Sequence, residues 1–247
     1  KKLAENKYFS VIFPKSLGGL ELDPISYGLF FEHAGKYCSN VRNLFLVSMS
    51  MVGGSILKCG TQKQVKYWLP QIMDGSMIGA FAMTEPEVGS DIASLQTTFE
   101  EVSGEFRLNG RKKWTTLGGI ADFLLLIARN EDKIGVFIVE TDRNGIKRRD
   151  MQGLLGNRAS HIAEIEFENV MVPRENVLGS LDYGMNKTVS VALDIGRYNT
   201  AWAGVALAQA CLEEMVSYAR TRSQFGKKIR TYQLIQKMIG DAVTNIH

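Results

Sequence analysis

The chain has 247 residues, of which 45% are hydrophobic and 22% are charged. These proportions are typical of a folded globular protein and argue against a disordered one. The formal net charge of +3 is too small to indicate a nucleic-acid partner by itself. The cysteines at 38, 59 and 211 form no C-x-x-C pair and no disulfide framework, which favours a reducing compartment.

No apolar run is long enough to cross a bilayer, and no secretory signal or transit peptide is visible. We therefore predict a cytoplasmic protein and leave the mitochondrial matrix open as an alternative. Lys1 lies in helix-like sequence without an initiator Met, and His247 follows no helix stop signal. We expect the sequence to be part of a longer chain.

The first 75 residues have a helical pattern. Asp23 followed by Pro24 is typical of an N-cap and a first helical turn. The apolar residues that then fall on one helical face are Ile25, Leu29, Phe30, Ala34 and Tyr37. A second helix is expected over residues 41–57. A third begins after Thr61, and its expected inward residues are Val65, Trp68, Leu69 and Ile72.

Between residues 77 and 179 the apolar period changes to two. The pattern predicts strands over residues 78–83, 105–108, 123–128, 136–139 and 162–167, separated by turn signals such as Asn-Gly. Because no helices alternate with these strands, we predict an antiparallel β domain. Helical periodicity then returns and predicts a long helix over residues 183–220, about 55 Å at 1.5 Å per residue, and a second helix from Thr231.

The predicted fold class is therefore α+β, in the chain order helices, sheet, helices. The expected domains are a partial helical domain over residues 1–76, a β domain over 77–180 and the first part of a helical bundle over 181–247. Several common site motifs are absent, among them G-x-G-x-x-G, the P-loop, H-E-x-x-H and G-x-S-x-G. The histidines are far apart in the sequence, so no metal site is predicted.

Three segments carry candidate chemistry. Residues 81–91 place Pro86, Gly89 and Ser90 after a strand, where backbone amides can bind a polar ligand, although an ordinary polar loop explains them equally well. Residues 110–116 contain a Trp that can line a planar ligand or simply pack on the sheet. Residues 220–230 hold five basic side chains that suit phosphate binding or a solvated hairpin tip.

Together these segments resemble the acyl-CoA dehydrogenase family over nearly the whole chain. The family patterns T-E-P-x-x-G-S-D, N-G-x-K-x-W, L-D-x-x-R and R-x-x-F-G occur in order at residues 84–91, 109–114, 193–197 and 222–226. The resemblance implies an acyl-CoA dehydrogenase-like fold with a C-terminal bundle that tetramerises, so a homotetramer or homodimer is expected. It also implies the cofactor FAD, whose redox chemistry the protein would orient.

The resemblance further implies roles for individual residues. Those expected at the isoalloxazine ring or the adjoining ribityl and phosphate groups are Phe81, Met83, Thr84 and Ser90, with Thr84 hydrogen-bonding the flavin. Those expected on the far side of the ring are Trp114, Thr115 and Thr116. Those expected to reach the FAD of a neighbouring subunit are Arg222, Ser223, Gln224, Tyr232 and Gln233. Those expected to contact the acyl thioester are Ser90, Asp194 and Arg197.

The implied reaction removes the α-proton of an acyl thioester with a carboxylate and transfers a β-hydride to flavin N5. Hydrogen bonds to the thioester carbonyl would stabilise the developing charge, and burial would raise the pKa of the carboxyl group. We assign no catalytic residue in this sequence, because the expected Glu lies beyond His247. The alternative family position is occupied by Gly196. Leu117 also departs from the polar residue common after the W-x-[ST] triplet, which leaves hydrogen bonding at the flavin edge open.

The substrate is an acyl-CoA or an acyl group on an acyl-carrier protein. Residues 193–204 and 208–212 look like biosynthetic members from polyketide-type pathways, some of which oxidise a carrier-bound hydroxyacyl unit. A DNA-binding or non-catalytic flavoprotein on the same fold is the alternative from another class, although a nucleic-acid partner is not expected. The electron acceptor, a flavoprotein or oxygen, cannot be read from the sequence.

Overall fold

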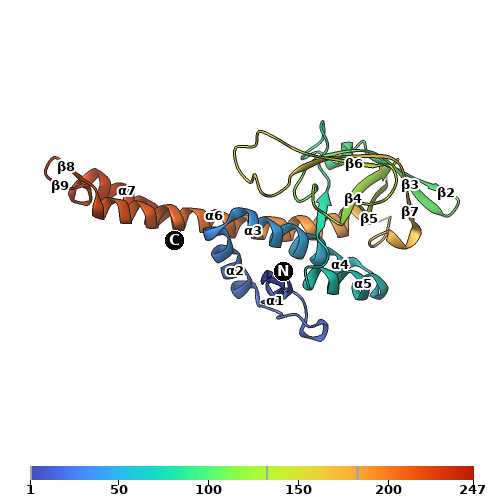
Figure 1. Cartoon of the computed structure of the whole chain (residues 1–247), viewed down its shortest axis with the longest axis horizontal. Helices are drawn as coiled ribbons and strands as arrows, with labels where there is room; N and C mark the ends of the chain where they lie inside the picture. Colours follow the sequence, from blue (N-terminus) through green and yellow to red (C-terminus); the bar gives the residue numbers. More distant parts are fainter. Residues whose placement is uncertain (1, 132, 182–183) are drawn as a thin grey trace.

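The structure is a computed structural model that describes residues 2–131, 133–181 and 184–247. Three parts follow one another along the chain: a group of helices, a β-sheet domain and a helical hairpin (Figure 1). The N-terminal helices are α1 (Lys2–Glu5), α2 (Pro24–Tyr37), α3 (Ser39–Leu44), a π-helical segment (Phe45–Gly53), α4 (Gly54–Cys59) and α5 (Gln62–Met73). This α, β, α order confirms the predicted fold class.

The predicted helix starts are confirmed by their caps. The Asp23 carboxylate accepts hydrogen bonds from the backbone amides of Ile25 and Ser26, at 3.0 and 3.1 Å. Thr61 and Gln64 form a reciprocal capping box, in which each side chain accepts from the other residue's amide. These bonds pair amides that have no partner within the helix, so both helices begin where the sequence predicts.

Helix α2 buries only part of the apolar face seen in the sequence, because Phe30 and Ala34 pack on the core while the other three residues are exposed. Ile25, Leu29 and Tyr37 are 69%, 52% and 77% exposed, whereas Phe31 is fully buried together with the glycines at 28 and 35. A Cβ on Gly28 would lie 2.0 Å from the ring of Trp202. Helix α2 therefore packs against the C-terminal helix α6 through its small residues, because only glycine permits so close an approach.

The predicted helix over residues 41–57 is confirmed as a helical run, but its centre is π-helical. There the Ser50 hydroxyl donates to the carbonyl of Phe45, five residues earlier, at 3.0 Å, and accepts from the Tyr27 hydroxyl at 2.7 Å. The Asn199 amide donates to the same Tyr27 oxygen at 2.8 Å. Burial raises the pKa of Tyr27 to about 12, so this link between α2, the π-helix and α6 stays protonated.

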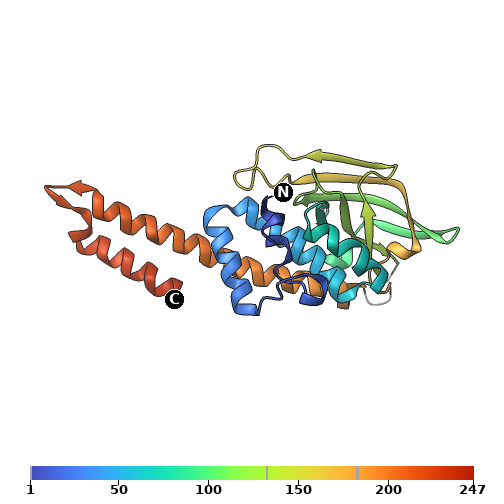
Figure 2. The same ribbon diagram turned by 60° about the horizontal axis from the view of Figure 1, so that its bottom comes forward.

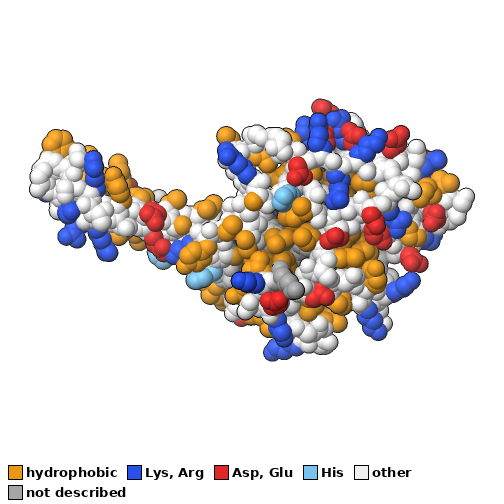
Figure 3. All heavy atoms as spheres, in the orientation of Figure 1, with side chains coloured by type: hydrophobic (Ala, Val, Ile, Leu, Met, Phe, Trp, Pro, Cys, Tyr) orange, Lys and Arg blue, Asp and Glu red, His pale blue; other side chains and the backbone are white. Residues whose placement is uncertain are grey.

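The middle domain is one sheet with the strand order β1-β4-β2-β3-β7-β6, and β5 pairs with β4. Its strands are β1 (Gly79–Ala82), β2 (Thr98–Val102), β3 (Glu105–Thr115), β4 (Phe123–Asn130), β5 (Lys133–Glu140), β6 (Ile146–Asp150) and β7 (Ala163–Pro173). Most pairs are antiparallel, as predicted, but β1 and β2 run parallel to β4. Strand β6 is mostly charged and exposed, and charged side chains gather over the sheet domain in Figure 3. Strand β2 is short and has one buried apolar residue, Phe99, so neither strand gave an apolar period.

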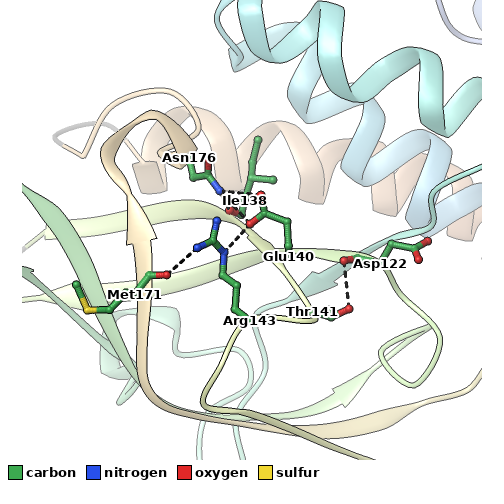
Figure 4. A network of polar contacts seen from close by, with 7 residues as sticks. All are labelled: Asp122, Ile138, Glu140, Thr141, Arg143, Met171 and Asn176. Atoms are coloured by element: carbon green, nitrogen blue, oxygen red, sulfur yellow. Dashed lines mark hydrogen bonds and ion pairs between the residues drawn. The ribbon is translucent and has the colours of Figure 1, made fainter.

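A polar network joins the end of β5 to the end of β7 (Figure 4). Arg143 donates to the Glu140 carboxylate at 2.6 Å and to the carbonyl of Met171 on β7 at 2.9 Å, and Asn176 donates to a β5 carbonyl at 2.7 Å. The Asp122 carboxylate accepts the amide of Ile78 at 2.7 Å, directly before β1. The Asp122–Ile78 bond fixes the start of β1, whose other end carries the candidate site.

The C-terminal part is a helical hairpin whose first half packs against the N-terminal helices and whose tip projects away from the rest of the chain (Figures 1 and 2). Its helices are α6 (Ser190–Thr221), which follows a π-helical turn (Gly184–Val189), and α7 (Gln233–Ile246), with the short strands β8 (Ser223–Gln224) and β9 (Lys227–Lys228) at the tip. The long helix is confirmed, and its predicted start at Tyr183 lies outside the described residues. Helix α7 has no buried residue, although Leu234 and Met238 mark an apolar face.

Candidate functional site

The end of β1 and the end of β3 lie side by side. The Lys113 amide donates to the Thr84 carbonyl at 2.8 Å, directly after β1 ends at Ala82. Phe81 and Met83 are partly buried and pack against the helical core, so this strand end lies at the junction of the helices and the sheet. The structure thus brings together two of the three segments that carry candidate chemistry, the Thr84 loop and the Trp114 segment.

Trp114 occupies a strained bulge. The pairing of β3 with β7 shifts between Lys112 and Thr115, and Trp114 has a φ of 62°, in the left-handed region. A bulky residue rarely adopts that conformation, which costs about 1–3 kcal/mol and is found mainly at functional sites. The bulge turns the indole outward, where it is 50% exposed, with the Lys113 ammonium 5.2 Å from the ring centroid. A flat aromatic surface is therefore presented at the end of β3.

The residues after Trp114 offer hydroxyl groups. Thr115 is 2% exposed, and its hydroxyl has no hydrogen-bond partner among the described residues. A buried hydroxyl without a partner is an exception in folded proteins, and a water or a ligand group can supply the missing hydrogen bond. Thr116 is half-buried. Leu117 is buried and donates its amide to the Ser160 carbonyl at 2.8 Å, so its apolar side chain belongs to the sheet core rather than to the site.

The loop after Thr84 is open where the sequence placed ligand-binding amides. Its base is closed by reciprocal backbone bonds between Glu85 and Val88. Beyond them Gly89 and Ser90 are exposed, and a Cβ on Gly89 would meet no atom within 4 Å. The Gly89 backbone is therefore accessible to an anionic or polar ligand.

A buried ion pair lies beneath both segments. Lys112 and Glu85 have side chains 0% and 3% exposed, and Lys112 Nζ lies 2.8 Å from Glu85 Oε1. The same ammonium donates to the Met83 carbonyl at 2.9 Å. Burial lowers the pKa of Lys112 to about 8, against the opposing effect of Glu85, so the lysine is mostly protonated at pH 7.

Glu85 is stabilised as a carboxylate. It accepts backbone amides from Gln96 at 2.7 Å and from Thr97 at 3.0 Å, besides the ammonium of Lys112. Burial raises the pKa of this carboxyl, but the hydrogen bonds and the charge of Lys112 outweigh that effect and hold it below the usual value. Our sequence analysis missed this pair. The signal was present, because Lys112 continues the inward alternation of Phe106 and Leu108 along β3.

The residues expected at the acyl thioester lie on α6. Arg197 and Asp194 form an ion pair within one helical turn, Nη1 to Oδ1 2.9 Å, with side chains 71% and 75% exposed. The neighbouring Leu193 is partly buried and packs on the core cluster that joins the helices to the sheet. A Cβ on Gly196 would lie 3.5 Å from Met51 Sδ, so α6 faces the π-helix here.

The basic segment lies at the tip of the helical hairpin, far from the sheet (Figures 1 and 2). Tyr232 donates its hydroxyl to the Gln224 carbonyl at 2.9 Å and carries the Lys227 ammonium over its ring. Phe225 is 94% exposed with a φ of 51°. The structure does not bring Arg222, Ser223 or Gln233 to the Thr84 loop of the same chain.

These groups fit the flavin that the resemblance implies. An exposed indole, an unpartnered buried hydroxyl and an open glycine backbone suit a planar, polar ring system, and the basic tip suits a diphosphate. Among the described residues no group of three His, Cys, Asp or Glu side chains is placed to hold a metal ion. No helix in the described ranges is long and apolar enough to cross a membrane.

Comparison with known proteins shows which family this fold and site define. Models of the acyl-CoA dehydrogenase N-terminal, middle and C-terminal domains match residues 1–76, 80–170 and 183–247. The chain belongs to the acyl-CoA dehydrogenase family, which confirms the resemblance seen in the sequence.

Individual relatives agree. The caffeyl-CoA reductase–Etf complex subunit CarC of Acetobacterium woodii is 35% identical over 254 residues, covering 99% of this chain and 66% of CarC. Glutaryl-CoA dehydrogenase of Mycobacterium smegmatis, solved with FADH2, superposes with a TM-score of 0.94 at 28% identity, covering 100% of this chain and 63% of that one. The prolyl acyl carrier protein oxidase AnaB has a TM-score of 0.93 at 27% identity and coverages of 99% and 66%. The chain spans about two thirds of each.

Proposed function

We propose that the protein is an FAD-dependent enzyme that dehydrogenates an acyl thioester. The observation that carries the proposal is the pairing of the Thr84 loop with the strained, outward-facing Trp114 through the Lys113–Thr84 hydrogen bond. Family membership and the FADH2 complex of a solved relative support the choice of cofactor. When bound, FAD would accept the β-hydride of the substrate.

In this proposal the chain's own residues bind and orient the flavin. Phe81, Met83, Thr84 and Ser90 line one side of the ring and its adjoining chain. Trp114 supplies an aromatic wall on the other side, and the free hydroxyl of Thr115, with that of Thr116, supplies hydrogen bonds. Water is displaced from the ring by the indole, which strengthens the remaining polar interactions.

The substrate contacts in the proposal are Ser90, Asp194 and Arg197. Arg197 is three residues after Asp194, so both side chains point from one helical face and can converge on one polar group. None of the described carboxylates is assigned as the base that takes the α-proton. Gly196 in the alternative family position offers no proton acceptor.

We further propose that Arg222, Ser223, Gln224, Tyr232 and Gln233 serve the FAD of a neighbouring copy in a homotetramer or homodimer. The electron acceptor we propose is an electron-transferring flavoprotein, because the relative CarC is named as part of an Etf complex. Whether the acyl group arrives on CoA or on a carrier protein is a second question. The likeness to AnaB supports the carrier alternative, and the acyl-CoA names of other relatives support CoA.

The test is cofactor uptake followed by substrate reduction. The purified full-length protein is expected to be yellow with one FAD per subunit, and its flavin to bleach anaerobically with an acyl thioester. A panel of acyl-CoA esters is compared with the same acyl groups on a carrier protein. A protein that takes up no FAD on reconstitution contradicts the whole proposal. If FAD binds but neither substrate form bleaches it, only the proposed dehydrogenase activity is contradicted.

A further inference from the structure

Lys112 and Glu85 form the most deeply buried ion pair among the described residues, and it joins the two segments of the proposed flavin site. Its hydrogen bonds run from Lys112 Nζ to the Met83 carbonyl and to Glu85, and from the Gln96 and Thr97 amides to Glu85. We refer to this set of bonds as the Lys112–Glu85 clasp. It fixes both ends of the Thr84 loop to strand β3, two residues before Trp114.

A clasp of this kind is a poor device for stability alone. Burying two charges costs much of what their attraction returns, and apolar pairs of similar volume are often as stabilising or more so. The surrounding sheet positions are apolar, with Phe106 and Leu108 on the same face of β3 fully or almost fully buried. The ion pair adds geometric specificity that apolar packing lacks. The ammonium donates to one carbonyl, and the carboxylate accepts from two amides, each at a fixed place in the chain.

This specificity matters because the backbone of Trp114 is strained. Its left-handed backbone persists only if neighbouring contacts hold it. On one side the Lys113 amide is bonded to the Thr84 carbonyl, and on the other the Lys112 side chain is bonded to Met83. Both restraints run between the same two chain segments, so the position of Thr84 and that of Trp114 are set together.

We propose that the Lys112–Glu85 clasp is a positioning device that sets the spacing between Thr84 and Trp114, and so pre-organises the site for a planar ring. This inference rests on the proposed function, since the ring is taken to be the isoalloxazine of FAD. Neither residue is catalytic, because both side chains are buried beneath the site. They act through Thr84 and Trp114.

The test compares the full-length wild type with Lys112→Met, which keeps the side-chain length and removes the charge and both donated bonds. Glu85→Gln removes the charge from the other end. The matched control is Lys147→Met, the same replacement at a lysine paired with Glu168 across an exposed strand pair at 3.3 Å. The measurements are FAD dissociation constants of the apoproteins, flavin absorption spectra and midpoint potentials, and hydrogen exchange of the Lys113 amide.

We expect Lys112→Met to weaken FAD binding at least tenfold, to shift the flavin spectrum and midpoint potential, and to speed exchange of the Lys113 amide. Lys147→Met is expected to match the wild type. If Lys112→Met does not fold, Glu85→Gln is expected to show the same changes. A folded variant that is less stable but has an unchanged FAD affinity and potential overturns the inference alone. A wild type that binds no FAD overturns the proposed function and the inference with it.

Discussion

Replacing Arg197 with alanine tests whether this residue contacts the substrate or only stabilises its helix. The structure shows only an exposed pair with Asp194, three residues earlier on α6, with side chains 71% and 75% exposed. Exposed pairs of this spacing contribute about 0.2–0.5 kcal/mol to stability, so removing one is expected to leave the melting temperature almost unchanged. Any large effect of Arg197→Ala must therefore arise from contacts with a ligand.

If Arg197 lies beside the acyl thioester, its loss leaves Asp194 unpaired in a site closed by substrate. We expect flavin reduction to slow by at least about tenfold, which corresponds to about 1.4 kcal/mol in the barrier. FAD content is expected to stay near normal, because the proposed flavin contacts lie on other segments. The assay is single-turnover flavin bleaching under anaerobic conditions with saturating acyl thioester, alongside a thermal melt.

Lys237→Ala is the matched control, since Lys237 forms a comparable exposed pair with Asp241 on α7, at 2.5 Å. The control is expected to bleach at the wild-type rate. Bleaching by Arg197→Ala at the wild-type rate would place the residue outside the site. A large drop in melting temperature together with loss of FAD would also refute the assignment, because it would show that the Arg197–Asp194 pair stabilises the fold.

Three other predictions follow from the structure. Arg222→Ala is expected to weaken FAD retention and loosen the oligomer, measured by flavin content and sedimentation; a monomer that keeps FAD would contradict it. Gly110→Ala is expected to cost about 1–3 kcal/mol in denaturant unfolding, because its Cβ would lie 2.6 Å from Thr97 at a φ of 147°; wild-type stability would refute this. The depressed pKa of Glu85 gives stability that is present above its ordinary pKa of 4.5 and is lost as pH falls through its lower folded pKa. Glu85→Gln is expected to lack this acid dependence in unfolding measured from pH 7 to 3.

The sequence predicted the elements whose signals are local. The Asp23 and Thr61 caps, the central strand β4 and the long helix α6 all follow from residues close together in the chain. It predicted only part of the buried face of α2, because the close packing at Gly28 is set by the ring of Trp202, which lies far along the sequence. Nor did apolar periodicity reveal β2, which has a single buried apolar residue, or β6, whose side chains are largely charged.

The site was only partly predictable for the same reason. The motifs at Thr84 and Trp114 were visible, and their adjacency became visible only through the Lys113–Thr84 bond between strands that are distant in sequence. The Lys112–Glu85 pair was overlooked because a lysine in a strand is ordinarily assigned to solvent. Lys112 shares the period-two alternation of Phe106 and Leu108 along β3, and that shared alternation indicates that its side chain points inward.

The placement of the two candidate binding regions constrains how one cofactor could use both. The exposed indole and the open loop lie at the junction of sheet and helices, whereas the basic segment lies at the far tip of the hairpin (Figure 1). Helix α6, which carries the tip, extends about 48 Å over its 32 residues at 1.5 Å per residue. Its first half packs against α2 and the π-helix, and its second half holds the tip away from the sheet (Figures 1 and 2). If both regions bind the same FAD molecule, the proposed site therefore combines the ring-binding region of one copy with the basic tip of another.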